Sequence, residues 1–241
     1  MLGNLGIVIL ALIAFLPAVA YVVWIRNTEK YNREPWGGIF AVFLWGATIA
    51  IAVSIFLEML FQVPFSRAFP WDATLGVSVL LAPLAEEFAK PLGIRYVGRA
   101  ISEPEDGLIY GAICGLGFAA TENLLYEWDA AASGNVAQFA TTVMVRSVAS
   151  MLLHASATAM TGYGISMAIL KRRPLSSALP YYLVAVGMHG AYNFIVSVDI
   201  FGALFSLFLA IAFSVACIMY IRKRIVEMDN KSVLREVFWW K

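Results

Sequence analysis

Residues 81–91 read Leu81-Ala-Pro-Leu-Ala-Glu86-Glu87-Phe-Ala-Lys90-Pro91, which places charged side chains inside an otherwise apolar stretch. A charge at the centre of a membrane span costs about 2.5–3.5 kcal/mol on insertion scales. A helix can therefore carry Glu86, Glu87 and Lys90 through lipid only if they face one another or a hydrated cavity. The stretch predicts a membrane protein whose working site lies among its helices.

The composition of the whole chain is that of a membrane protein. Of its 241 residues, 61% are apolar and 14% are charged, whereas soluble domains are nearer one half apolar and one quarter charged. The net charge of +1 gives no indication of a nucleic-acid partner, and we expect none. The two cysteines lie in apolar runs, so no disulfide framework is expected.

Seven apolar segments are long enough to cross a bilayer, which takes about 20 helical residues. They are residues 5–25, 38–61, 74–94, 107–126, 139–170, 178–198 and 201–221. The first segment has no positive residues before it and is too long for the apolar region of a signal peptide, so we expect a retained span. The sequence predicts an all-α, polytopic transmembrane helix bundle in the cell membrane, with one domain over residues 1–241.

Lys and Arg residues of the loops gather on one side of the predicted bundle. They occur in the first, third and fifth loops and in the tail, whereas the opposite loops hold only Arg67. Because loops rich in Lys and Arg stay in the cytosol, we expect the N-terminus outside and the C-terminus in the cytosol. Residues 222–241 are expected to form a short cytosolic tail with an interfacial anchor at its Trp-rich end.

Four of the predicted spans carry polar stripes. The candidate site residues are Glu86, Glu87, Lys90, Glu122, His154, His189 and Asn193. Glu86 precedes Lys90 by four positions, which is the favourable order for a helical ion pair. His189 and Asn193 share one helical face at the same spacing, as do His154 and Thr158. Both histidines of the chain belong to these stripes, so we expect the stripes to converge on one interior site.

Structural interpretations compete with this site. Glu122 could be an acid that reaches the interface from the outer end of its span, and interfacial anchoring is the favoured interpretation of Arg146. Glu58 is interpreted as interfacial. A buried pair of Glu86 and Lys90 could serve helix packing alone, but a second adjacent glutamate exceeds what a simple pair needs.

The residue types favour hydrolysis of a carbonyl group. Adjacent carboxylates in a low-dielectric pocket repel each other, while a nearby ammonium favours ionisation of one of them. One ionised and one protonated acid suit acid–base catalysis. The ionised glutamate can take a proton from water, and His189 and Asn193 can stabilise the oxyanion. The residues leave open whether Glu86 or Glu87 is the base.

Other catalytic chemistries have weaker support in the sequence. No Gly-x-Ser-x-Gly motif is present, and neither cysteine lies in a polar stripe. The His-Glu-x-x-His motif is also absent. Glutamate and neutral histidine are legitimate zinc ligands, so a zinc-dependent version of the site stays open, although we expect no cofactor and assign no metal ligand.

The order of these motifs resembles that of the PrsW family of intramembrane glutamic-type proteases. The matching motifs are Glu86-Glu87-x-x-Lys90, Phe118-x-x-x-Glu122, His154, His189-x-x-x-Asn193 and, after the first span, Tyr31-Asn-Arg-Glu34-Pro35-Trp36. The family is distantly related to the CAAX prenyl proteases and the bacteriocin-processing membrane proteases. These relatives usually have a histidine where this chain has Glu122 and an arginine where it has Lys90, which favours the PrsW family and leaves the role of Glu122 open.

The resemblance implies an endopeptidase that cuts a membrane-anchored protein substrate. In the family's known case this substrate is an anti-sigma factor, cleaved in a stress-signalling cascade. The family's catalytic pair falls on Glu86 and Glu87. The residues that surround this pair are Glu122, His154, His189 and Asn193.

Two other functions are not excluded by the sequence. Intramembrane sets of Glu, His and Lys also form proton relays, so a proton-coupled transporter is an alternative, although the chain shows no inverted repeat. A non-catalytic membrane scaffold with the same fold is another. The sequence does not indicate the oligomeric state.

Overall fold

The computed structural model describes residues 3–68, 72–198 and 202–239, with side chains described through Lys231. All regular structure in this part of the chain is helical, which confirms the predicted all-α class. The elements are α1 (Asn4–Arg26), α2 (Trp36–Trp45), η1 (Gly46–Ala50), α3 (Ile51–Ala68), α4 (Ala73–Gly76), η2 (Val77–Leu81), α5 (Ala82–Ala89), η3 (Lys90–Val97), α6 (Pro104–Ala132), α7 (Val136–Val145), η4 (Arg146–Ser150), α8 (Met151–Leu170), η5 (Leu175–Ala178), α9 (Leu179–Ser197) and α10 (Ala203–Trp239).

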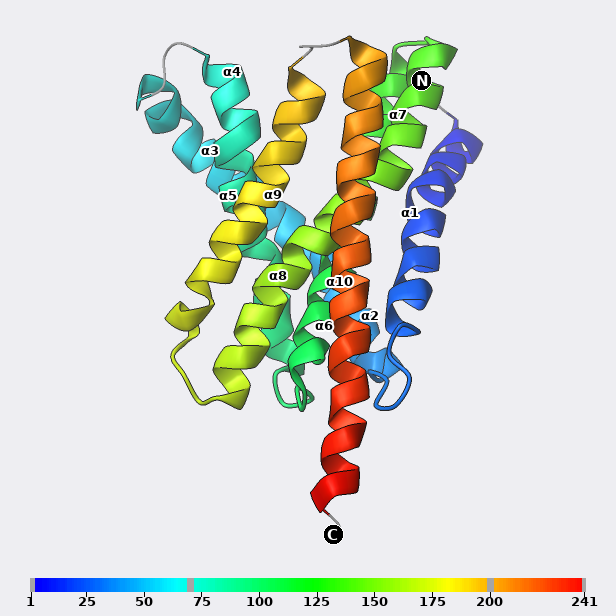
Figure 1. Cartoon of the computed structure of the whole chain (residues 1–241). Coiled ribbons are helices and arrows are strands. Elements are labelled where there is room, and N and C mark those ends of the chain that lie inside the picture. Colours follow the sequence, from blue (N-terminus) through cyan, green and yellow to red (C-terminus); the bar gives the residue numbers. More distant parts are fainter. Residues whose placement is uncertain (1–2, 69–71, 199–201, 240–241) are drawn as a thin grey trace.

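Several of these elements join end to end into long rods (Figure 1). One rod combines α2, η1 and α3, a second runs from α4 to η3, and a third combines α7, η4 and α8. Within the described residues, five stretches are long and apolar enough to cross a membrane, namely Asn4–Arg26, Trp36–Ala68, Pro104–Ala132, Val136–Leu170 and Ala203–Lys231. The rods coincide closely with the predicted spans. The polytopic helix bundle is therefore confirmed, whereas the number of spans and the orientation stay predictions.

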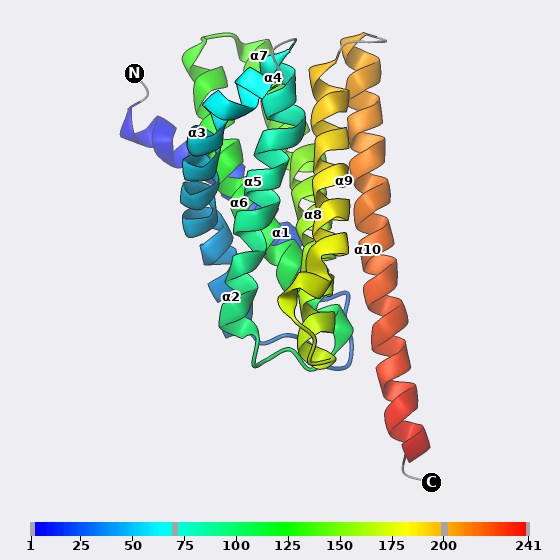
Figure 2. The same cartoon turned by 90° about the vertical axis from the view of Figure 1, so that its left-hand side faces the viewer.

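Helix α10 runs along one side of the bundle and extends past the other helices at its C-terminal end (Figure 2). The predicted tail of residues 222–241 is thus a continuation of this helix as far as Trp239. The anchor predicted at its Trp-rich end lies outside the described side chains.

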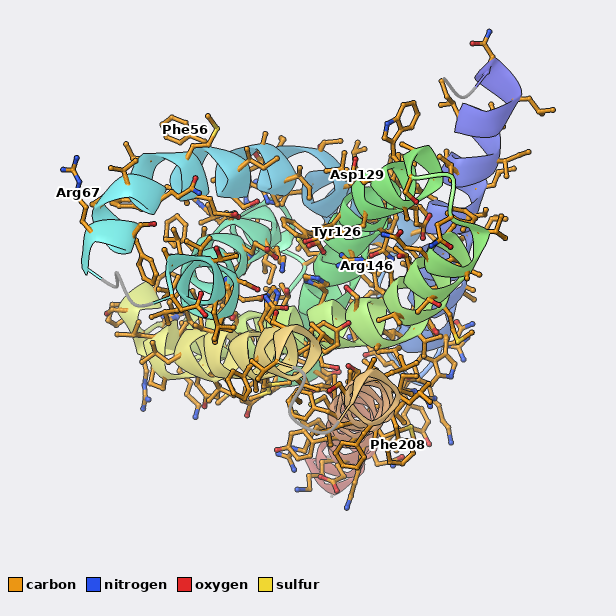
Figure 3. All side chains as sticks on the ribbon, turned by 90° about the horizontal axis from the view of Figure 1, so that it is seen from above. Phe56, Arg67, Tyr126, Asp129, Arg146 and Phe208 are labelled. Carbon is orange, nitrogen blue, oxygen red and sulfur yellow. The ribbon has the colours of Figure 1, made fainter. Side chains whose placement is uncertain are left out.

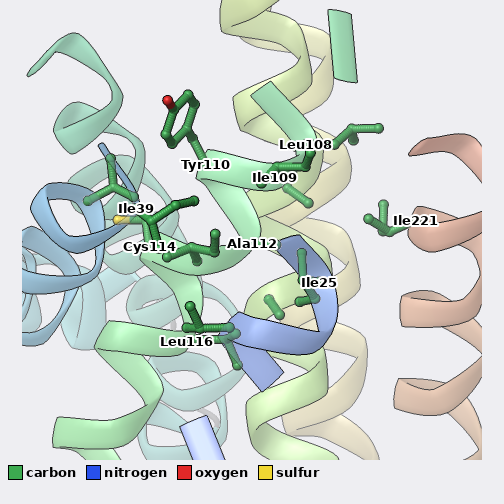
Figure 4. Close-up of a cluster of buried hydrophobic side chains, with 14 of the residues drawn as sticks. Ile25, Ile39, Leu108, Ile109, Tyr110, Ala112, Cys114, Leu116 and Ile221 are labelled. Atoms are coloured by element: carbon green, nitrogen blue, oxygen red, sulfur yellow. The ribbon is translucent and has the colours of Figure 1, made fainter. Parts of the chain in front are cut away.

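Helix α6 is the centre of the bundle. Of its most apolar window, 78% is buried, against 22% for α1. Its apolar side chains pack with those of α1, α2, α8 and α10 in one continuous cluster, which includes Ile25, Ile39, Leu116 and Ile221 (Figure 4). This core holds α6 and α8 in the fixed relation that the polar residues require.

Glycines allow α6 and α8 to approach backbone to backbone. A Cβ atom at Gly111 would meet the carbonyl oxygen of Thr158, and one at Gly115 would meet that of His154. Small residues at four-residue spacing permit such contact between membrane helices. The close approach brings the polar stripe of α8 against α6, where it meets the charged residues of α5.

Three π-helical segments, η1, η2 and η4, interrupt the long rods. Such segments disturb the regular helical bonding and are frequent at functional sites. In each, a backbone carbonyl accepts a hydrogen bond from a side chain of another helix. The bonds are Thr121 Oγ1 to Ala47 O (2.7 Å), Asn193 Nδ2 to Ser78 O (2.8 Å) and Asn123 Nδ2 to Arg146 O (3.1 Å). These bonds fasten the irregular turns to α6 and α9.

Candidate active site

The Lys90 ammonium group is at the centre of the buried polar cluster. Its Nζ donates to Glu86 Oε2 at 2.9 Å and to Glu87 Oε1 at 2.8 Å, and it lies 2.8 Å from His154 Nδ1. The side chain is fully buried and also lies 4.1 Å from the centre of the Phe118 ring. An ammonium has three hydrogens, so these three acceptors use its whole donor capacity.

Glu87 is held on both of its carboxylate oxygens. Besides Lys90, His189 Nδ1 lies 3.0 Å from Glu87 Oε1, and the Thr158 hydroxyl donates to Glu87 Oε2 at 2.9 Å. The side chain is fully buried. Hydrogen bonds to the charged form favour that form, so Glu87 is an ionised carboxylate that fixes its neighbours in place.

Glu86 has a different environment from its neighbour. Its Oε2 accepts the bond from Lys90, while its Oε1 accepts none from the described residues. The residue is 6% exposed and lines a cavity of about 980 Å³, whose lining does not include Glu87. Glu86 is therefore the glutamate that water and a substrate can reach.

The surroundings of His154 determine which ring nitrogen carries the hydrogen. Lys90 can only donate, so His154 Nδ1 accepts and Nε2 is protonated in the neutral ring. Nε2 lies 2.9 Å from Glu122 Oε2. The same carboxylate oxygen forms an ion pair with Arg146 Nη2 at 2.5 Å. A continuous polar chain thus runs from Lys90 through His154 and Glu122 to Arg146.

Arg146 is connected to the polar cluster through its ion pair with Glu122, a contact that interfacial anchoring alone does not require. Its Nε donates to Asn123 Oδ1 at 2.8 Å, and its guanidinium carbon lies 4.0 Å from the centre of the Tyr126 ring. Figure 3 shows Arg146 and Tyr126 side by side. The Arg146 side chain is only 14% exposed, because neighbouring helices surround it. Glu122 is held between this guanidinium and His154, so it does not extend from the bundle as a free acid.

The cavity beside Glu86 lies toward the end of the bundle where α4 and α7 are found (Figure 1). Its charged and histidine lining residues are Glu58, Glu86, Glu122, Arg146 and His154. Glu58, interpreted from the sequence as interfacial, therefore lines the same cavity as Glu86 and Glu122. In the predicted orientation the cavity opens toward the outside of the cell.

Asn193 stands apart from the other candidate residues. Its Nδ2 donates to the Ser78 carbonyl of η2, and the residue lines the cavity. The remaining candidates, Glu86, Glu87, Lys90, Glu122, His154 and His189, form one connected network. The structure thus brings six of the seven predicted residues together. Asn193 lines the same cavity but forms no hydrogen bond with the other six.

Residues 34–221 match the model of a family described as PrsW family intramembrane metalloprotease. The chain belongs to the PrsW family. It is similar to Protease PrsW of Clostridioides difficile (strain 630), with 28% identity over 196 residues that cover 79% of this chain and 80% of the relative. Protease PrsW of Geobacillus kaustophilus (strain HTA426) is 27% identical over 188 residues, covering 74% and 76%. No solved structure gives a significant match.

Membership of the PrsW family makes the chain a multi-pass cell-membrane protein and a membrane protease. The polar cluster supplies what a peptide hydrolase needs, namely a reachable carboxylate beside a cavity and charged groups that orient it. The family favours the protease over the transporter and the scaffold.

The types of side chain at this PrsW family site are ones that bind zinc. Glu86, His154 and His189 each offer a ligand atom, and the three atoms lie within 4.8 Å of one another. Two histidines and one glutamate form a recognised catalytic zinc set. Glu122 beside His154 Nε2 is the type of outer carboxylate that orients a ligating histidine. Lys90 already contacts His154 Nδ1, so a metal at that atom requires the ammonium to move.

The structure also adds residues to the predicted PrsW family site. Thr158 bonds Glu87, and its position four residues after His154 on α8 is a signal that the sequence already contains. Tyr126 covers Arg146 and follows Glu122 by four positions on α6. Helical spacing already placed Thr158 on the polar stripe of His154 and could have indicated Tyr126 in the same way, whereas the contribution of Glu58 depends on how α3 packs.

Proposed function

We propose that this chain is an intramembrane endopeptidase that hydrolyses a peptide bond of a membrane-anchored protein, with Glu86 as the base that activates water. The observation that supports this assignment is the difference between the two glutamates. Glu86 lines the cavity and has an oxygen without a donor among the described residues, whereas both oxygens of Glu87 are occupied.

The proposed reaction begins with a water molecule hydrogen-bonded to Glu86 Oε1. Glu86 takes one proton as the water oxygen attacks the scissile carbonyl carbon, which forms a tetrahedral intermediate. The same proton then passes to the amide nitrogen, and the carbon–nitrogen bond breaks. Lys90 holds the other Glu86 oxygen at 2.9 Å and so keeps the carboxylate oriented.

Asn193 is the proposed donor to the oxyanion. It lines the same cavity as Glu86, and its bond to the Ser78 carbonyl uses one amide hydrogen and leaves the other. His189, expected from the sequence to share this role, lies against Glu87 and is assigned instead to positioning that carboxylate. His154 and Glu122 hold Lys90 and Arg146 in place.

The proposed substrate is a single protein segment that reaches the cavity from the membrane. The resemblance to the PrsW family suggests an anti-sigma factor, cleaved in regulated proteolysis, as the first class to test. The cavity of about 980 Å³ has room for an extended peptide of a few residues.

The test compares glutamine variants of the two glutamates after co-reconstitution with a membrane-anchored substrate. Glu86→Gln should lower the cleavage rate by about 10²–10⁴-fold, because general base catalysis contributes that much, while thermal unfolding changes little. Glu87→Gln should lower both the cleavage rate and the unfolding temperature. Glu227→Gln, on exposed α10, is the matched control. Wild-type cleavage by a correctly inserted Glu86→Gln protein would contradict the proposal.

A zinc-dependent version is the second candidate, favoured by the set of Glu86, His154 and His189. When bound there, zinc would supply an activated water at neutral pH. The chain's own residues would hold it, with Glu122 orienting His154. Metal analysis of the purified protein, with cleavage before and after chelation, separates the two versions. The glutamate mechanism predicts cleavage that chelators do not change.

A further inference from the structure

A second group of carboxylates lies at the opposite end of the bundle from the cavity. There the connection between α1 and α2 and the first turn of α6 meet the side of α10 (Figure 1). The acidic residues are Glu29, Glu34, Glu103, Glu105, Asp106 and Asp229, named here the acidic cluster. The protease chemistry uses none of them.

Backbone groups hold several members of the acidic cluster in fixed positions. Asp106 Oδ2 accepts from the backbone N–H groups of Ser102 (2.7 Å) and Glu103 (2.9 Å), while the Glu103 side chain accepts from the backbone of Asp106. Asp229 Oδ2 accepts from the backbone N–H of Lys30 at 2.9 Å. The cluster therefore connects three segments that are distant in the sequence, with its carboxylates oriented before any ligand arrives.

The Glu29 carboxylate is buried in the acidic cluster, and no described residue forms a hydrogen bond with it. Its relative exposure is 0%, and neither carboxylate oxygen has a partner among the described residues. One ligand oxygen of each of Glu29, Glu103 and Asp106 lies within 4.8 Å of the other two. Glu105, also at 0%, has both oxygens without partners in the same part of the structure. Native proteins pair such groups or bind a cation with them.

Three arginines near the acidic cluster donate their Nε hydrogens to groups other than the Glu29 carboxylate. Arg26 Nε donates to the backbone carbonyl of Glu34 at 2.7 Å, and Arg33 Nε donates to that of Glu29 at 2.8 Å. Arg222 donates to the Thr28 hydroxyl. Burial and the neighbouring carboxylates raise the pKa of Glu29 to about 9, which reflects the same excess of negative groups.

We propose that Glu29, Glu103 and Asp106 bind a hard divalent cation, Mg²⁺ or Ca²⁺. The site offers only oxygen atoms, which such cations prefer, whereas the donor set at Glu86 contains two histidine nitrogens. A bound cation neutralises the buried carboxylates and joins the α1–α2 connection to the start of α6. Since Asp229 is bonded to the same connection, the cation also stabilises the docking of α10.

Calorimetric titration of the chelator-treated, detergent-purified protein with MgCl₂ and, separately, with CaCl₂ tests this proposal. The wild type should bind one of them saturably, and the same ion should raise the unfolding temperature followed by tryptophan fluorescence. Glu29→Gln and Asp106→Asn should each weaken binding by about tenfold or more, because ligand charge sets affinity at such sites. Glu227→Gln on α10 and Glu86→Gln at the protease site should bind like the wild type.

The ion-free form of Glu29→Gln gives a second, independent readout. An amide of the same size replaces a buried, unpartnered carboxylate, so the ion-free variant should unfold at the wild-type temperature or higher. An ion-free Glu29→Gln that unfolds at a lower temperature would overturn the proposal. So would the absence of saturable binding by the wild type, or Glu29→Gln binding with wild-type affinity.

Discussion

Lys90 Nζ lies 2.8 Å from His154 Nδ1, which joins the start of η3 to the first turn of α8. The same ammonium binds Glu86 and Glu87, so one cation orients both glutamates and determines which nitrogen of His154 carries the hydrogen. The charges predicted from the sequence to need partners in lipid therefore have them in a single group of contacts. We therefore expect both the stability of the cluster and the proposed chemistry to depend on Lys90.

Lys90→Met should leave two buried carboxylates without their cation. Breaking a buried ion pair by removal of one partner costs about 3–5 kcal/mol, so the unfolding temperature should fall sharply. Adding Glu87→Gln to Lys90→Met removes one of the unpaired charges and should recover part of this loss. Thermal unfolding of both single variants and the double variant measures the coupling. Strictly additive effects would contradict the pairing of Lys90 with Glu87.

Local helix geometry explains which contacts of the site could be predicted from the sequence. Lys90 is three and four residues from Glu87 and Glu86, so their side chains meet whatever the rest of the fold does. That His154 and His189 lie beside these charges is a weaker prediction, because it rests only on the need of buried charges for polar partners. The difference between Glu86 and Glu87 depends on how α5 is rotated in the bundle, which sequence spacing does not determine.

The π-helical segments account for what the sequence could not predict. Arg146 begins η4, pairs with Glu122 of α6, and accepts a hydrogen bond from Asn123 of the same helix on its backbone carbonyl. The sequence predicted that Asn193 stabilises an oxyanion. In the structure its amide group also donates a hydrogen bond to the Ser78 carbonyl of the irregular η2 segment. No sequence motif predicts a π-helical segment. The contacts of Arg146 with Glu122 and of Asn193 with Ser78 could therefore be identified only from the three-dimensional structure.

Gly115→Ala should separate α6 from α8. The added Cβ meets the backbone carbonyl of His154, which cannot move as a flexible side chain would. Overpacking of this kind costs about 1–3 kcal/mol, and displacement of His154 should lower the cleavage rate as well. Gly187→Ala on α9 is the matched control, because its Cβ meets nothing within 4 Å. Equal unfolding temperatures for the two variants would refute the close approach.

Arg146→Gln should weaken the site through Glu122 while leaving Glu86 in place. Without the guanidinium, His154 Nε2 is the one close partner that Glu122 keeps among the described residues, so the orientation of His154 and Lys90 loosens. Loss of such an outer contact typically lowers activity by about 10–100-fold. Arg67→Gln, in the exposed last turn of α3, is the control and should cleave the substrate at the wild-type rate. A cleavage rate for Arg146→Gln equal to that of Arg67→Gln would return Arg146 to a role at the interface.

Comparison of Asn193→Leu with Thr121→Val distinguishes two roles for Asn193, namely anchoring a π-helical segment and taking part in catalysis. Each variant removes one side-chain bond to the carbonyl of such a segment, Ser78 in η2 or Ala47 in η1. An unsatisfied buried carbonyl costs about 1–3 kcal/mol, so both variants should unfold at lower temperatures. Only Asn193 lines the cavity, since Thr121 is not among its lining residues.

The comparison of cleavage rates then decides the role of Asn193. Removal of one oxyanion donor lowers kcat by about 10²–10³-fold, whereas loss of anchoring alone should act mainly through stability. Measured well below both unfolding temperatures, Asn193→Leu should therefore lose far more kcat than Thr121→Val. Asn193→Gln, which restores an amide at a shifted position, should recover part of the thermal stability and little of the rate. If Asn193→Leu and Thr121→Val lose activity equally, Asn193 only anchors η2 and the oxyanion donor is another residue of the cavity.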